Sequence, residues 1–91
     1  MWSTRDPDGR KVVLTDERWD HVLFGHPYIG VAPEDIVDAV ARPDARMVGP
    51  GQFEEWFYRE GAGPSAWIKV VVHYEYRRGL ILTAFPRRTY P

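Results

Sequence analysis

The chain has 91 residues, a formal net charge of −1 and no cysteine. The length fits one domain, and the lack of cysteine excludes a disulfide scaffold, a thiolate zinc site and a thiol nucleophile. The charge excludes binding to nucleic acid by bulk positive charge. No apolar run approaches the ~20 residues that span a bilayer, and the first residues lack the apolar stretch of a signal peptide. The composition therefore predicts a soluble, cytoplasmic domain with no membrane partner.

The N-terminal third predicts a strand and then a helix. Residues 1–10 are polar and are expected to be flexible, with a tight turn at 6–9 where Pro and Gly occupy turn positions. A short strand is expected over 11–14. Apolar residues then recur at i, i+3, i+4 and i+7, which predicts an amphipathic helix that begins after Thr15 and ends between residues 24 and 26.

A second helix is expected from Pro33, a residue favoured in the first helical position, to Arg42-Pro43. The rest of the chain predicts strands, with a turn over Arg77-Arg78-Gly79. The expected strands cover 46–48, 53–59, 67–76 and 80–85. Helices that precede a run of strands indicate an α+β fold. We expect the N-terminal strand and two short helices packed on one face of an antiparallel sheet of about four strands.

Two histidines fall in the first helix. His21 and His26 are five residues apart, so their directions differ by about 140° and they do not form the i, i+4 pair that grips zinc. Arg18 lies three residues before His21 and shares its face. A histidine beside an arginine is a candidate general acid or base near neutral pH. The alternatives are a surface side chain for His21 and a helix-ending residue for His26.

The long expected strand carries a second group. Lys69 and His73 fall on the same face, two pleats apart. A lysine that points inward is costly unless its charge meets an anion or solvent, so Lys69 is a candidate phosphate-binding residue. The alternative is an exposed sheet face, on which lysine and histidine are ordinary.

The aromatic strand carries a third group. Tyr58 and Arg59 are neighbours and should point to opposite faces unless a bulge intervenes. Aromatic rings beside an arginine can stack a base and bind its phosphate, whereas Phe57 is expected in the core. Thr83 lies in the last strand, where a buried hydroxyl needs a partner.

Two pairs of adjacent arginines are further candidates for binding an anionic partner. Arg77-Arg78 and Arg87-Arg88 are expected near one end of the sheet, with Arg10 and Lys11 close by if the first and last strands are neighbours. They would then form a local positive edge, although charge runs at turns are more often only solvated.

The order and spacing of these segments resemble the barnase–EndoU–colicin–RelE superfamily of metal-independent endoribonucleases, in its phage-associated branch. The residues that carry the resemblance are Arg18 to Pro27, Pro43-Asp44, Tyr58-Arg59, Lys69 to Val72 and Thr83 to Pro86. The resemblance covers about residues 12–86. A net charge of −1 departs from the basic charge expected of a free ribonuclease toxin.

The resemblance implies a domain that cleaves RNA through its 2′-hydroxyl, without metal or cofactor, as a toxin paired with an antitoxin or immunity protein. His21 matches the motif histidine and is the first candidate for general base or acid. Arg59 and Lys69 match the cationic positions, and Thr83 matches a position that bonds a phosphate oxygen. The residues expected to contact substrate are Arg18, His26, Tyr58 and His73.

The main alternative is a non-catalytic relative that binds a protein or RNA. The mildly acidic charge and two tryptophans expected to be exposed, Trp2 and Trp56, suit that role. A weaker alternative is a domain that binds a small molecule through its aromatic cluster. The pattern predicts no particular oligomeric state.

Overall fold

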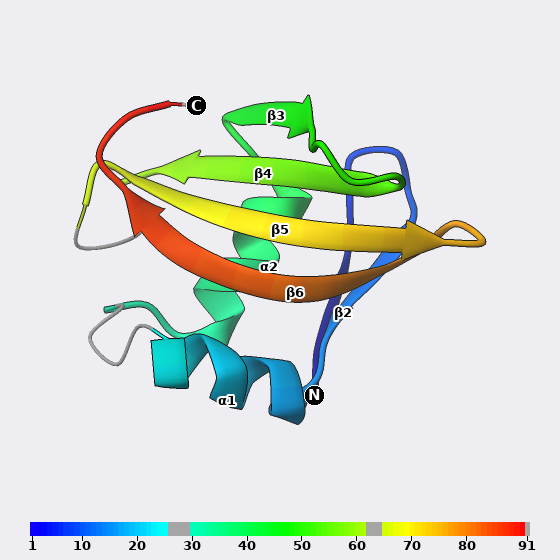
Figure 1. Cartoon of the computed structure of the whole chain (residues 1–91), viewed down its shortest axis with the longest axis horizontal. Coiled ribbons are helices and arrows are strands. Elements are labelled where there is room, and N and C mark those ends of the chain that lie inside the picture. Colours follow the sequence, from blue (N-terminus) through cyan, green and yellow to red (C-terminus); the bar gives the residue numbers. More distant parts are fainter. Residues whose placement is uncertain (26–29, 62–64, 91) are drawn as a thin grey trace.

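The computed structural model describes residues 1–25, 30–61 and 65–90, and within them the chain forms a six-stranded mixed sheet with two helices (Figure 1). Neighbouring strands are antiparallel except β2 and β6, which are parallel. The strand order is β1-β2-β6-β5-β4-β3. The elements are β1 (Trp2–Arg5), β2 (Lys11–Leu14), α1 (Asp16–Gly25), α2 (Pro33–Ala41), β3 (Ala45–Val48), β4 (Glu54–Glu60), β5 (Trp67–Glu75) and β6 (Arg78–Arg87).

The helices take different positions around this sheet. α2 lies behind the sheet in Figure 1, while α1 lies along β6 at the edge that β2 leaves unpaired. The expectation that both helices pack on one face is therefore correct for α2, whereas α1 is at the sheet edge. Neither described helix is long or apolar enough to cross a membrane. The core between α2, α1 and the sheet consists of Val12, Leu14, Val22, Ile36, Ala39, Val40, Phe57, Ile68, Val70, Val72, Tyr74, Ile81 and Ala84.

The predicted helices are confirmed with close boundaries. α2 begins at Pro33, and the Asp35 carboxylate accepts a hydrogen bond from the Ala32 N–H at 2.8 Å, which satisfies a backbone donor at the helix start. The Arg42 N–H donates to the Asp38 carbonyl at 2.8 Å and closes the last turn. The turn predicted at 6–9 is also present, with the Gly9 N–H bonded to the Asp6 carbonyl at 2.9 Å.

The sheet is larger than predicted, and part of it is parallel. Residues 2–5, expected to be flexible, form β1, in which Trp2 and Thr4 alternate with exposed residues. Trp2 is half-buried, because its ring packs edge-on against Trp19 at 6.2 Å and its Nε1 donates to Glu34 at 3.3 Å. β6 continues through Pro86 to Arg87, beyond its expected end. A long connection returns the chain beside β2, which makes that pair parallel.

Gly79 lies within β6 and not in the turn that was predicted there. A Cβ at this position would approach Val72 Cγ1 to 2.8 Å and both Tyr74 Cε1 and Val12 Cγ2 to 2.9 Å. The glycine is therefore required by close packing of three core side chains and not by a turn conformation.

Gly79→Ala is expected to lower the free energy of unfolding by about 1–3 kcal/mol, because the added methyl overpacks the core. Urea denaturation of the variant measures this change. Gly25→Ala is the matched control, since a Cβ at Gly25 meets nothing within 4 Å. Equal stability of Gly79→Ala and the wild type would show that the core relaxes around the methyl.

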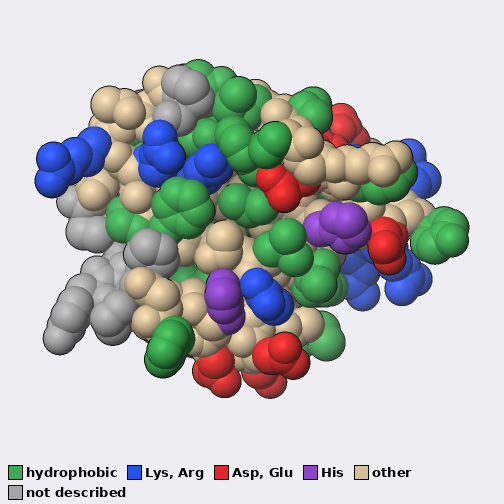
Figure 2. Space-filling view, viewed as in Figure 1, with side chains coloured by type: hydrophobic (Ala, Val, Ile, Leu, Met, Phe, Trp, Pro, Cys, Tyr) green, Lys and Arg blue, Asp and Glu red, His purple; other side chains and the backbone are tan. Residues whose placement is uncertain are grey.

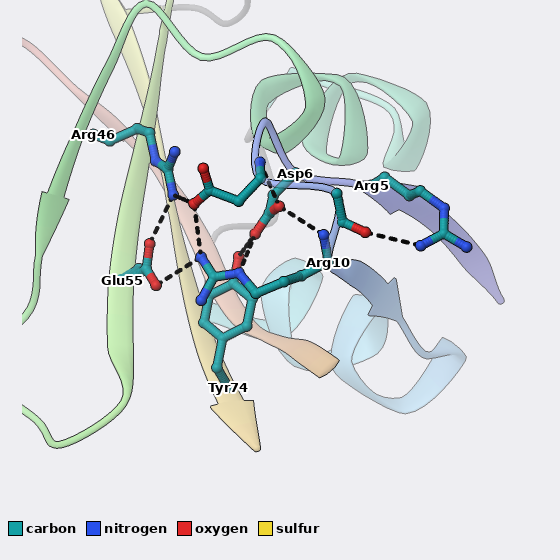
Figure 3. Close-up of polar contacts among 8 residues, drawn as sticks. Arg5, Asp6, Arg10, Arg46, Glu55 and Tyr74 are labelled. Carbon is teal, nitrogen blue, oxygen red and sulfur yellow. Dashed lines mark hydrogen bonds and ion pairs between the residues drawn. The ribbon is translucent and has the colours of Figure 1, made fainter. Parts of the chain in front are cut away.

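A buried carboxylate fixes the β1–β2 turn against the sheet (Figure 3). Asp6 accepts hydrogen bonds from the N–H groups of Asp8 and Arg10 at 2.9 Å, from Arg10 Nε at 2.8 Å and from the Tyr74 hydroxyl at 2.8 Å. Burial by itself would raise the pKa of Asp6, but the bonds from Tyr74 and Arg10 outweigh it and lower the pKa below its ordinary value.

Arginine side chains extend this network to β4 and β3. Arg10 lies 3.7 Å from the centre of the Tyr74 ring and pairs with Glu55 at 2.8 Å. Arg46 bridges Glu55 at 3.0 Å and Asp8 at 2.9 Å. Two arginines and three carboxylates thus join the β1–β2 turn to β3 and β4.

Candidate functional site

The face of the sheet opposite α2 carries four of the eight predicted site residues, namely Tyr58, Lys69, His73 and Thr83. Directly paired residues share a face, and Lys69 of β5 stands opposite Tyr58 of β4 and Phe85 of β6. Figure 2 shows this face, on which hydrophobic side chains surround Lys and Arg side chains over the strands. We call it the open face; its residues on the three long strands are Glu54, Trp56, Tyr58, Glu60, Trp67, Lys69, Val71, His73, Glu75, Arg78, Leu80, Thr83, Phe85 and Arg87.

Lys69 lies at the centre of the open face within a set of aromatic rings. Its Nζ is 3.3 Å from the centre of the Trp56 ring, 5.5 Å from that of Phe85 and 5.8 Å from that of Tyr58. The residue is 7% exposed, and no carboxylate of the described residues lies within 4.0 Å of its ammonium. The rings attract the cation but leave it without a counter-ion.

The surroundings of Lys69 also change its acidity. Burial lowers the pKa of Lys69, the nearby charge of Arg87 lowers it further, and Glu54 opposes both. Glu54 is not paired with the ammonium; its Oε2 accepts a hydrogen bond from Trp56 Nε1 at 2.8 Å and holds that ring in place. The site thus provides a partly desolvated cation with hydrogen-bond donors, which suits an anionic group such as a phosphate.

An irregularity in β6 lies beside this cation. Thr83 pairs with Val71 and Ile81 with Val72, so Leu82 is an extra residue at a β-bulge. The Leu82 carbonyl accepts hydrogen bonds from Arg18 Nε at 2.9 Å and from Arg18 Nη2. The bulge therefore anchors α1 along β6, next to Thr83.

Arg18 and His21 have different surroundings on α1. Arg18 is half-buried and its guanidinium binds the main chain of β6, so it acts here as a positioning residue. His21, one turn later, is exposed. Figure 2 shows histidine side chains both over α1 and over the strands of the open face.

His73 lies on the open face with Lys69, as predicted. Its Nε2 is 3.5 Å from Glu75 Oε1, so the two side chains form an ion pair when the imidazole is protonated. The residue is about one-third exposed and lines a hollow of about 340 Å³ that also includes Leu80 and Val13. A partly exposed imidazole beside a carboxylate is suited to proton transfer.

The structure does not bring Arg59 to these residues. β4 has no bulge in its pairing with β5, so Tyr58 and Arg59 point to opposite faces. Arg59 Nη1 donates to the Arg42 carbonyl at 2.6 Å, and the guanidinium lies 3.8 Å from both Asp38 and Asp44. His26 lies outside the described residues. Phe57 is in the core, as predicted.

The basic pairs are also separated. Arg78 begins β6 and Arg87 ends it, so the two pairs lie at opposite ends of a ten-residue strand and do not share one edge. Lys11 does stand opposite Arg78, because β2 neighbours β6. Arg10 belongs to the network around Asp6.

Three contributors to the open face have roles that were not predicted: Trp56 was expected to be exposed, Arg87 was expected in a basic edge, and Tyr90 was not a candidate. Trp56 is half-buried, not exposed, and its ring covers Lys69. Arg87 stands opposite Trp67. The ring of Tyr90, which follows β6, packs at 4.8 Å from Tyr58 and 5.7 Å from Trp67. The signal that could find the first two is strand parity once the register is known, whereas the place of Tyr90 depends on the course of the chain after β6.

No group of three or more His, Asp or Glu side chains among the described residues is arranged to hold a metal ion. Comparisons of the chain with protein-family models, with curated proteins and with solved structures each found no match.

Proposed function

We propose that the domain binds single-stranded RNA on the open face and cleaves it by attack of a 2′-hydroxyl on the adjacent phosphorus. The observation that carries the proposal is the Lys69 ammonium, buried among Trp56, Tyr58 and Phe85 with no carboxylate of the described residues in ion-pair distance. Aromatic rings beside cations are the groups that stack bases and bind phosphates of a single strand.

The proposed chemistry needs a base, an acid and a group that stabilises negative charge. A base removes the 2′ proton, the 2′ oxygen bonds to phosphorus, and the 5′ oxygen leaves with a proton from an acid, which yields a cyclic phosphate. His21 remains the first candidate for one proton transfer, and His73, on the same face as Lys69, suits the other. In this proposal Lys69 stabilises the charge on the phosphorane oxygens, and the Thr83 hydroxyl, on the same face, donates a hydrogen bond to one of them.

The motif resemblance supports two further parts of the proposal. It favours cytoplasmic RNA as the target and a toxin role, with an antitoxin or immunity protein as partner. The main alternative is RNA binding without cleavage. The half-buried rings of Trp56 and Phe85 beside Lys69 favour it, because such rings can stack bases without any histidine. Tyr58, predicted to contact substrate, is fully buried and supports Lys69 from below the surface.

Single-stranded RNA is expected to be cleaved in excess EDTA, and His21→Ala and His73→Ala are each expected to slow cleavage about 10²–10⁴-fold, the usual contribution of a general acid or base. A matched oligonucleotide with one 2′-deoxy position tests the nucleophile, because cleavage should stop at that position alone.

Three outcomes separate the possibilities. Full activity of His21→Ala overturns the assigned role of His21, and cleavage restored only by added divalent metal overturns the mechanism. RNA binding without cleavage at any enzyme concentration establishes the binding alternative. A circular dichroism spectrum of each variant shows that it is folded.

A further inference from the structure

Unusual backbone conformations converge at one end of the sheet. Phe53, Tyr76 and Arg77 are the non-glycine residues of the described chain with positive φ, at 64°, 49° and 63°. The two-residue turn between β5 and β6 consists of Tyr76 and Arg77, since Glu75 pairs with Arg78. This type of turn favours asparagine and glycine, so the chain retains two large side chains at an energetic cost.

These residues present exposed rings beside a hollow. Tyr76 is 98% exposed and Phe53 is 61% exposed. The Tyr74 N–H donates to the Phe53 carbonyl at 2.9 Å, which ties the segment before β4 to the end of β5. Phe53 and Tyr76, with Tyr74 and Glu75, line a hollow of about 400 Å³.

The charge around the turn is mainly positive. Arg77, Arg78 and Lys11 are exposed there, and Lys11 stands opposite Arg78. The carboxylate of Glu75 lines both this hollow and the hollow beside His73. The hollow lined by His73 also includes Tyr76 and Arg78, so it connects the open face with the turn. A ligand that passes His73 on the open face therefore reaches these rings and cations through this hollow.

We propose that the β5–β6 turn is a second contact for the same RNA strand, in which the Tyr76 ring stacks a base and Arg77, Arg78 and Lys11 bind the flanking phosphates. This inference rests on the proposed function and extends it. From Lys69 to Tyr76 the chain rises about 23 Å at ~3.3 Å per residue. That span equals about seven stacked nucleotides at ~3.4 Å each, so only a longer strand engages both contacts.

The test compares 2′-O-methyl oligouridylates of four and twelve nucleotides, which bind without being cleaved at the 2′ position. Tyr76→Asn removes the ring, keeps the charge and suits the left-handed backbone, so the variant should melt no lower than the wild type. We expect it to weaken binding of the twelve-mer about tenfold, the usual effect of one lost stacking contact. Binding of the four-mer should be unchanged. Phe24→Ala, which removes a 91% exposed ring from α1, is the matched control and should alter neither.

A second variant tests the charges. Arg77→Gln with Arg78→Gln should reduce the slope of log affinity against log salt by about 1.4 for the twelve-mer, since each phosphate contact to a single strand contributes ~0.7. Unchanged twelve-mer binding in Tyr76→Asn, while Lys69→Met loses it, overturns the inference and leaves the proposed function standing. Equal weakening of both lengths also overturns it. Failure of the wild type to bind either oligonucleotide overturns both proposals.

Discussion

Asp6→Ala is expected to lower the free energy of unfolding at pH 7 by about 3–5 kcal/mol, the usual effect of removing one partner from a buried ion pair. The Asp6 side chain is fully buried and accepts four hydrogen bonds, two of them from the backbone of its own turn. Without it, the Tyr74 hydroxyl and Arg10 Nε lose their acceptor in a site closed to water. In a domain of this size the melting temperature should fall by at least about 12 °C.

The pKa of Asp6 predicts how the difference in stability between the wild type and Asp6→Ala depends on pH. The folded-state pKa of Asp6 lies below its ordinary value of 3.8, so its contribution is complete above that pH and is lost as the pH falls through the folded pKa. Guanidinium denaturation at pH 7 and at pH 2.5 should show a smaller gap between wild type and Asp6→Ala at the lower pH.

Asp8→Ala is the control for this experiment, since it removes an exposed carboxylate from the same turn. It should change stability far less than Asp6→Ala. If the two variants lose equal stability, the buried hydrogen bonds of Asp6 are not what fixes the turn.

The elements with strong local signals were predictable from the sequence. Pro33 and the alternation of residues 67–75 determined α2 and β5 with nearly the correct boundaries, because both signals act within a few residues. That alternation also placed Lys69 and His73 on one face. β1 was missed because Ser3, Thr4 and Arg5 carry no apolar alternation, and its pairing with β2 depends on Asp6 and on Trp19.

The β5–β6 turn shows why the rest was not predictable. Gly79 is the residue with the greatest conformational freedom, so the local rule placed the turn there. The structure instead uses Gly79 for close packing and bends at Tyr76 and Arg77, which adopt positive φ. Tertiary packing of Val72 and Val12 decides this, and no local pattern contains it. Arg59 was assigned to the site by motif position, whereas strand parity directs it to the other face.

Lys69→Met is expected to lower the rate of RNA cleavage about 10²–10³-fold, comparable with removal of a group that stabilises transition-state charge. Methionine fills a similar volume between Trp56 and Phe85 but carries no charge. Its melting temperature should equal or exceed that of the wild type, because the desolvation that lowers the pKa of Lys69 is relieved. Cleavage kinetics and thermal melts on the same preparation separate the two effects.

The pH profile gives an independent measure of the same charge. The pKa of Lys69 in the folded protein lies below 10.5, so its ammonium is deprotonated at a lower pH than that of an ordinary lysine. Cleavage should therefore decline as the pH rises through the folded-state pKa of Lys69. Lys69→Arg keeps the charge at all accessible pH values, so the activity it retains should lack this alkaline decline. Arg42→Met, which removes an exposed cation at the end of α2, is the matched control and should cleave at the wild-type rate. Wild-type cleavage by Lys69→Met would show that the phosphate is stabilised by other groups, and the open face would then have to act through its aromatic rings alone.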